Sequence, residues 1–164
     1  MNGFATIYSI IEYNNNLKPT TVNNFEKIFL RIKNKGEVYK VLFSISGDYL
    51  AISTSLNLIK VYGINQNDSN SFNKLIFKVG SMNDIKLKLN IINFCFSPNE
   101  DYIVLGKSNS KVSVYNFKKK NSQWIVKEEK EFDYHKKAVF SVRVSPYGNY
   151  IATGSSDHSA IIYC

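Results

Sequence analysis

Short apolar runs recur along the chain, and each one ends in residues that favour turns. The run Val139–Ser145, for example, is followed by Pro146, Tyr147 and Gly148. Proline presets a turn dihedral and glycine tolerates a positive one, so each run predicts a short strand that ends in a tight turn. The three runs of this kind are Val38–Ser44, Ile91–Ser97 and Val139–Ser145.

More strands are predicted after each run. Val112 and Val114 alternate with Ser113, as expected of a half-buried strand. The predicted second strands are Tyr49–Ser53, Tyr102–Gly106 and Tyr150–Gly154, and the third strands are Leu58–Ile64, Lys111–Phe117 and Ser159–Tyr163. A fourth strand is predicted in two places, Phe72–Val79 and Trp124–Phe132.

The three stretches align without a gap from Val38, Ile91 and Val139. Each has a serine, a tyrosine five residues later and a second tyrosine 18 residues after the serine. The serines are Ser44, Ser97 and Ser145, and the tyrosines are Tyr49, Tyr102 and Tyr150, then Tyr62, Tyr115 and Tyr163. Four strands per unit at this period indicate a β-propeller. The predicted fold is all-β. It is an incomplete propeller of about three blades, each of four antiparallel strands.

Residues 38–163 resemble the WD40 repeat family, whose units carry a histidine, a Phe-Ser-Pro turn, a turn aspartate and a final Trp-Asp pair. His135, ten residues before Ser145, matches the histidine, Asp157 matches the aspartate, and Tyr163 stands in place of the tryptophan. The other units depart from the pattern. Their histidine positions hold Asn34 and Leu87, their aspartate positions hold Leu56 and Asn109, and no unit ends in Trp-Asp.

The resemblance divides the chain into four segments. Residues 1–36 are expected to form N-terminal strands of a partial or closing blade, at Phe4–Glu12 and Phe25–Ile32. Repeat 1 spans 37–80, repeat 2 spans 81–134, and repeat 3 spans 135–164 without its outer strand. A closed ring of this family has about seven blades. We therefore expect the N-terminal portion of a longer propeller, or a propeller part that a partner chain completes, and expect the isolated chain to associate.

The final 30 residues raise the question of a hydrolytic triad, because they contain histidine, serine and aspartate. The resemblance implies instead a structural hydrogen-bond network of His135, Asp157, Ser155 or Thr153, and Tyr163. A nucleophilic triad needs an exposed serine, an oxyanion hole and a pocket, and the sequence has no Gly-x-Ser-x-Gly elbow. No catalytic residue is predicted, and hydrolysis remains only a third hypothesis.

The formal net charge of +8 adds a second hypothesis for the partner. Lysine supplies almost all of it, since only Arg31 and Arg143 are arginine. A diffuse lysine charge attracts polyanions, but lysine side chains recognise phosphates and base edges less specifically than arginine side chains do. Lys118–Lys120 is interpreted as an exposed turn. Lys86 and Lys88, in the loop Gly80–Leu89, are candidate partner contacts.

The remaining chemistry is sparse. Cys95 and Cys164 make no disulfide framework, and Cys95 is expected to be a buried hydrophobe. No metal-ligand spacing, phosphate-binding loop, signal peptide or membrane span is predicted, so we expect no cofactor and an intracellular location, in cytoplasm or nucleus. The predicted function is a non-catalytic scaffold for protein–protein interactions within a multi-subunit assembly. The alternative is a propeller subunit of a ribonucleoprotein or chromatin complex with electrostatic nucleic-acid contacts.

Overall fold

The computed structural model describes residues 2–8, 28–65, 73–80, 90–121 and 123–164, and these residues form strands and turns without a helix. The strands are β1 (Asn2–Tyr8), β2 (Ile28–Lys35), β3 (Val38–Phe43), β4 (Tyr49–Thr54), β5 (Leu58–Gly63), β6 (Leu75–Val79), β7 (Ile91–Phe96), β8 (Tyr102–Lys107), β9 (Val112–Lys120), β10 (Gln123–Phe132), β11 (Val139–Val144), β12 (Ile151–Ser155) and β13 (Ala160–Tyr163). In this part of the chain there is accordingly no helix long and apolar enough to cross a membrane.

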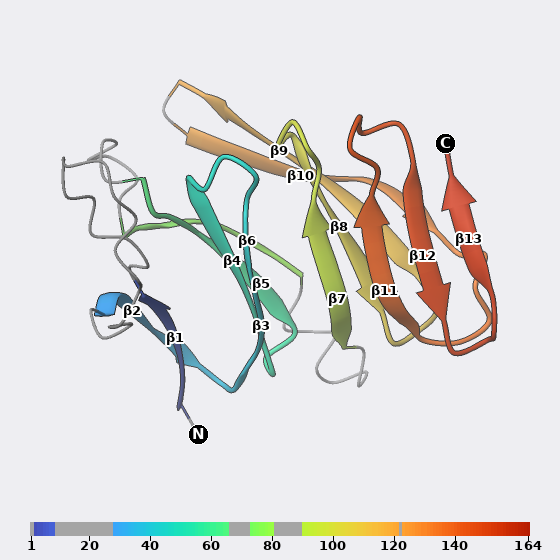
Figure 1. Ribbon diagram of the computed structural model, residues 1–164, viewed down its shortest axis with the longest axis horizontal. Coiled ribbons are helices and arrows are strands. Elements are labelled where there is room, and N and C mark those ends of the chain that lie inside the picture. Colours follow the sequence, from blue (N-terminus) through green and yellow to red (C-terminus); the bar gives the residue numbers. More distant parts are fainter. Residues whose placement is uncertain (1, 9–27, 66–72, 81–89, 122) are drawn as a thin grey trace, which may run out of the picture.

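The strands form antiparallel sheets that stand side by side (Figure 1). Blade 1 is β3-β4-β5-β6, blade 2 is β7-β8-β9-β10, and blade 3 is β11-β12-β13. The N-terminal hairpin is the separate two-stranded sheet β1-β2. The all-β prediction with incomplete propeller blades is confirmed.

One assignment from the sequence is wrong. Lys118, Lys119 and Lys120 were expected in an exposed turn, but they form the end of β9, where Lys118 pairs with Ile125 and Lys120 with Gln123. The lysines are exposed, as expected. The strand continues because the β9–β10 hairpin is longer than the other blade hairpins, and its cross-strand hydrogen bonds keep the lysine segment extended.

The same turn closes the first hairpin of all three blades. Its serine Oγ accepts a hydrogen bond from the backbone N–H of the tyrosine five residues later, at 3.1, 3.0 and 3.0 Å in blades 1 to 3. The third turn residue after each serine has a positive φ. These residues are Gly47, Glu100 and Gly148, with φ of 79°, 58° and 78°. The recurring serine and tyrosine in the sequence are therefore explained by turn geometry.

Two more backbone irregularities recur in register. Each first strand carries a register shift against the second, between Val38 and Lys40, Ile91 and Asn93, and Val139 and Ser141. The second turn of each blade has one residue of positive φ, and these are Asn57, Ser110 and His158. His158 is thus an exposed turn residue. Such details would not coincide in three unrelated sheets, so the blades are structural repeats.

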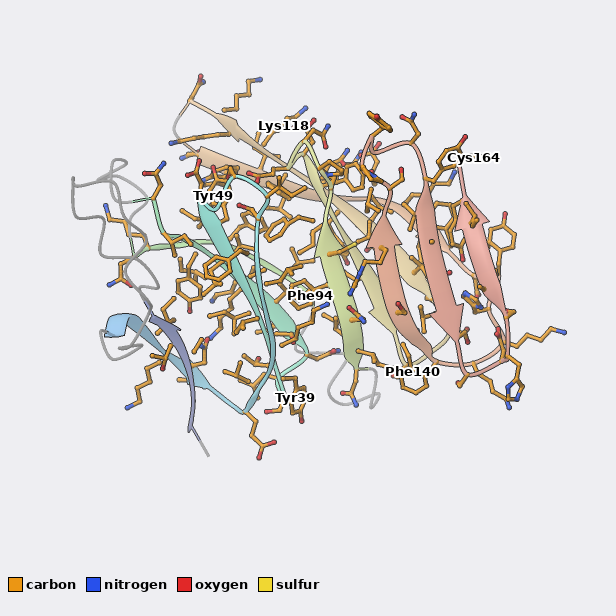
Figure 2. All side chains as sticks on the ribbon, in the orientation of Figure 1. Tyr39, Tyr49, Phe94, Lys118, Phe140 and Cys164 are labelled. Atoms are coloured by element: carbon orange, nitrogen blue, oxygen red, sulfur yellow. The ribbon has the colours of Figure 1, made fainter. Side chains whose placement is uncertain are left out.

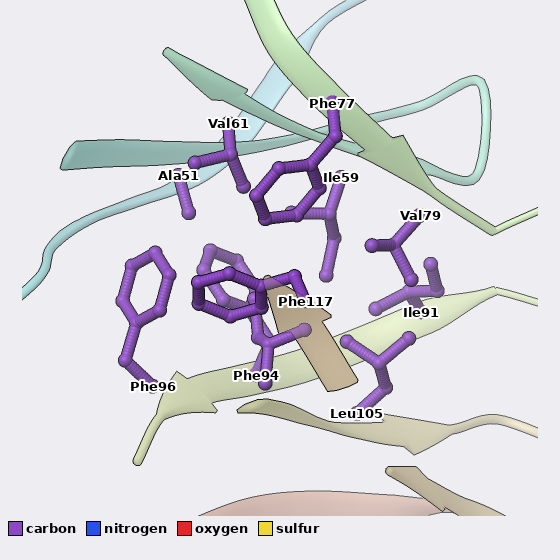
Figure 3. Packing of buried hydrophobic residues seen from close by; sticks show 11 residues of the cluster. Ala51, Ile59, Val61, Phe77, Val79, Ile91, Phe94, Phe96, Leu105 and Phe117 are labelled. Carbon is purple, nitrogen blue, oxygen red and sulfur yellow. The ribbon is translucent and has the colours of Figure 1, made fainter. Parts of the chain in front are cut away.

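Blades 1 and 2 enclose the larger of the two inter-blade cores (Figure 3). Ile59, Val61 and Phe77 of blade 1 face Phe94 and Phe117 of blade 2. Phe77 and Phe117 stack with ring centroids 4.8 Å apart. Complete burial of such side chains contributes about 1.5–3 kcal/mol each, so this interface stabilises the packing of blade 1 on blade 2.

Trp124, the only tryptophan, completes this core from β10. Its ring lies 5.7 Å from Tyr49, 5.9 Å from Phe77 and 6.1 Å from Phe117. The outer strand of blade 2 therefore packs across onto blade 1.

A second core joins blade 2 to blade 3. Val139 and Val142 of β11 pack on Cys95, Val104 and Val112. Cys95 is 6% exposed, so it is the buried hydrophobe that the sequence predicted. Burial raises the pKa of its thiol to about 11, which keeps the sulfur protonated and inert near neutral pH.

The N-terminal hairpin covers part of the opposite face of blade 1. Ala5 and Ile32 pack on Leu50 and Ile52 of β4. Val38 of β3 packs against the same cluster, and β1 lies against β3.

Candidate functional site

The network expected in the third repeat is assembled between the loop before β11 and the turn after β12. His135 Nδ1 lies 2.9 Å from Asp157 Oδ2, and His135 Nε2 lies 2.8 Å from Thr153 Oγ1. The His135 side chain has no exposed area, and that of Asp157 is 7% exposed. The backbone N–H of Lys136 also donates to Asp157 Oδ2, at 2.8 Å.

Asp157 is the electrostatic centre of this network. Hydrogen bonds from the Ser159 hydroxyl and from the backbone N–H of Lys136 hold the pKa of the Asp157 carboxyl well below its usual range. An ionised carboxylate only accepts hydrogen bonds, so His135 Nδ1 donates the proton to it. In the neutral ring Nε2 then accepts from the Thr153 hydroxyl, which fixes the tautomer.

The sequence reasoning missed Ser159. Its Oγ donates to Asp157 Oδ1 at 2.6 Å and lies 3.2 Å from His135 Nδ1. Its backbone N–H also donates to Asp157 Oδ1. A serine two residues after an aspartate in a predicted turn is the usual signal of an Asx turn, and that signal could have identified Ser159.

Among the described residues, Ser155 and Tyr163 make no hydrogen bond to His135. Ser155 Oγ donates to the Lys137 carbonyl and accepts from the Asp157 backbone N–H, so it braces the loop and the turn. The Tyr163 hydroxyl is buried near Thr153 without a well-formed hydrogen bond, and burial raises its pKa. Its ring stacks on Phe132, with centroids 4.4 Å apart.

This arrangement does not have the geometry of a nucleophilic triad. In a triad the carboxylate and the serine lie on opposite ring nitrogens of the histidine. Here Asp157 and Ser159 share Nδ1, and Thr153 takes Nε2. The described residues also hold no cluster of three or more His, Cys, Asp or Glu side chains that could bind a metal ion.

Blade 1 has a different polar group at the equivalent position. Asn34, which is 1% exposed, accepts hydrogen bonds through Oδ1 from Lys60 Nζ at 3.1 Å and from the Tyr62 hydroxyl at 3.4 Å. Asn34 stands in the sequence position of His135, and Tyr62 in that of Tyr163. The blade thus keeps a buried polar link with other residue types.

In blade 2, ion pairs link the outer strand β10 to the turn between β8 and β9. Glu131 of β10 binds Lys107 at 3.1 Å and Lys111 at 2.5 Å. Partial burial opposes ionisation of Glu131, but the two lysine hydrogen bonds outweigh it and lower its pKa. Lys86, Lys88 and Leu87, which precede this blade, lie outside the described residues.

Residues 126–164 match the family model described as WD domain, G-beta repeat. Over these residues the chain is similar to a WD40 repeat. No curated protein matches the chain significantly. The WD40 repeat begins inside β10 of blade 2 and runs through blade 3, so the sequence unit joins the outer strand of one sheet to the three inner strands of the next. The His135 network lies entirely within this WD40 repeat.

A basic cluster of Lys35, Lys60 and Lys78 lies beside Asn34. Lys60 and Lys78 are directly opposite each other on β5 and β6. Burial lowers the pKa of Lys60, and the neighbouring ammonium groups of Lys78 and Lys35 lower it further. None of the three forms a salt bridge with a carboxylate of the described residues.

Proposed function

We propose that the protein is a non-catalytic scaffold of the WD40 type that holds other proteins together within a multi-subunit assembly inside the cell. The WD40 repeat carries this proposal, because repeats of this family typically serve as protein-interaction modules. The His135 network supports it, since the buried His135 side chain is held by hydrogen bonds to Asp157 and Thr153.

The exposed surface supports the same function. Large apolar side chains are exposed on the open faces of blades 1 and 3, including Val41 at 48%, Phe140 at 56% and Ile162 at 71%. On blade 3, Ile162 lines one apolar hollow together with Val144, Tyr150 and Ala152, and contiguous apolar surface of this kind marks protein contacts on soluble proteins. Fold alone does not name the partner.

Affinity purification from the cells that make the protein tests this function. A tagged full chain, purified with and without nuclease treatment, is compared by quantitative mass spectrometry with a tag-only control. We expect a fixed set of proteins that copurify equally in both arms. Failure to retain any protein above the control would contradict the scaffold proposal.

The basic cluster of Lys35, Lys60 and Lys78 favours the second candidate, electrostatic contact with nucleic acid. Like charges directly opposite each other on a sheet repel, and a bound polyanion would relieve that repulsion. Loss of the copurified proteins after nuclease treatment would support this candidate. A direct binding assay should then show affinity falling steeply with added salt.

A further inference from the structure

The lysines of the basic cluster lack the carboxylate partners that lysines of blade 2 have. In blade 2, Glu131 forms ion pairs with both Lys107 and Lys111. Within the described residues, no lysine of the basic cluster forms an ion pair. Two blades of the same fold thus differ in how they treat their lysines, and the basic cluster keeps positive charge that no ion pair in this part of the chain compensates.

A neutral group holds Lys60 of this cluster in place. Its Nζ donates to Asn34 Oδ1 at 3.1 Å, and Asn34 is 1% exposed. The Tyr62 hydroxyl donates to the same oxygen at 3.4 Å. An amide oxygen accepts hydrogen bonds without carrying a charge, so Asn34 orients the ammonium group and does not neutralise it. An ammonium group has three donors, so Lys60 can donate to a ligand as well as to Asn34.

The other two lysines surround Lys60 with like charge. Lys78 lies directly opposite Lys60 on β6, so both side chains leave the sheet on the same face. Lys35 follows Asn34 in β2, and both Lys35 and Lys78 are exposed. Burial lowers the pKa of Lys60, and the charges of Lys78 and Lys35 lower it further. A half-buried cation thus lies beside two exposed cations, and a multiply charged anion would relieve the repulsion among them.

The charge and the number of donors indicate the class of anion. A phosphate monoester carries about −1.5 to −2 charges near neutral pH and has three acceptor oxygens. A carboxylate carries a single charge, and so does each phosphate of a nucleic-acid backbone. Lysine binds phosphate as a point charge, so three neighbouring ammonium groups match the monoester best. A single protruding phosphoryl group also reaches a half-buried lysine more readily than a continuous backbone does.

We propose that the basic cluster of Lys35, Lys60 and Lys78 binds the phosphoryl group of a phosphorylated side chain on a partner protein. Asn34 is the positioning residue, because it orients Lys60. Lys35 and Lys78 supply the remaining positive charge. This inference rests on the proposed scaffold function and names the class of partner, a protein whose attachment depends on its own phosphorylation.

Nuclear magnetic resonance titration of the isotope-labelled full chain at low salt tests the site. The probe is a short Gly-Ser peptide with one phosphoserine. The controls are the unphosphorylated peptide, the same peptide with glutamate in place of phosphoserine, and an oligothymidylate. We expect the phosphopeptide to bind about tenfold more tightly than each control, since only it brings a dianion. The proposal is overturned if the phosphopeptide shifts no resonance at millimolar concentration, or if glutamate or the oligothymidylate binds equally well.

Two variants locate the binding in the cluster. Asn34→Asp keeps the shape of the side chain and places a carboxylate beside Lys60, and Lys78→Gln removes one cation. We expect Asn34→Asp to weaken phosphopeptide binding about tenfold and Lys78→Gln about threefold to tenfold, with both variants at least as stable as the parent. A purely structural role of Asn34 would lower stability and leave the affinity of the folded chain unchanged, which would overturn its assignment.

Lys118→Gln is the matched control, because Lys118 is an exposed lysine without an ion pair in the described residues. Figure 2 shows Lys118 on β9, well away from β1 and β2. This variant should bind the phosphopeptide like the parent. An equal loss in all three variants would show general attraction by the net charge and would overturn the proposal.

Phosphatase treatment of the cell lysate before affinity purification separates this proposal from the scaffold function. We expect at least one copurifying protein to be lost after the treatment and also to be lost with the Asn34→Asp chain. Copurification that is unchanged in both cases would overturn the phosphoryl site and leave the scaffold function standing. The absence of any copurifying protein from untreated lysate would instead contradict the scaffold function itself.

Discussion

At the scale of single residues, burial alone does not decide the importance of a polar side chain in this chain; its partners do. Thr153 and Thr54 are both 3% exposed. The Thr153 hydroxyl binds His135 Nε2, whereas Thr54 Oγ1 is buried without a hydrogen-bond partner in the described residues. Replacing each threonine by valine therefore separates the contribution of the hydrogen bond to stability from the contribution of methyl packing.

We expect Thr153→Val to lower the free energy of unfolding by about 1–3 kcal/mol, because it leaves a buried imidazole nitrogen unsatisfied. Thr54→Val, the matched control, should be neutral or stabilising, since it removes an unsatisfied hydroxyl. Urea denaturation of the two variants measures both effects. Equal losses at the two positions would show that the His135 network contributes nothing specific.

Asp157 gives the network a dependence on pH. Its pKa is lower in the folded chain than the value of about 3.9 expected when unfolded, so its stabilising effect is complete above that pH and is lost as the pH decreases below it. Asp157→Asn should remove this part of the acid-induced loss of stability. Thermal melts between neutral and acidic pH would contradict the account if parent and variant lost stability in parallel.

At the scale of the strand, cross-strand pairs govern which substitutions the sheets accept. Lys60 and Lys78 are directly opposite each other and repel. Lys78→Glu should therefore raise the free energy of unfolding by about 0.2–1 kcal/mol through a favourable pair with Lys60, and Lys78→Gln should give a smaller gain. Chemical denaturation at low salt measures the difference, and a destabilised Lys78→Glu variant would contradict this arrangement of β5 and β6.

Most strands could be predicted because their apolar runs end at turn residues that geometry requires. Ser44, Ser97 and Ser145 each bind the tyrosine N–H across a turn, so a local pattern encodes a local structure. The extension of β9 through Lys120 could not be predicted, since it depends on pairing with β10. Nor could Asn34 be assigned its partners, because Lys60 and Tyr62 reach it only after the strands associate.

At the scale of the whole molecule, the central claim is that the three blades are repeats in one register and that blade 2 packs on β11, the first strand of blade 3. Gly106 and Gly154 are the same position in consecutive blades, but only Gly106 has a following blade packed on it. A valine at Gly106 must displace Val139 and Val142, and overpacking of this kind costs about 1–3 kcal/mol. At Gly154 a Cβ makes only an ordinary contact with Ser141 Cβ, at 3.6 Å, and valine favours the strand conformation.

The most direct test is to compare the free energies of unfolding of Gly106→Val and Gly154→Val at a protein concentration low enough for both to be monomeric. We predict that Gly106→Val is destabilised relative to the parent and that Gly154→Val is as stable as the parent or more so. Equal destabilisation of the two variants, or a tolerated valine at Gly106, would contradict the stacked repeat.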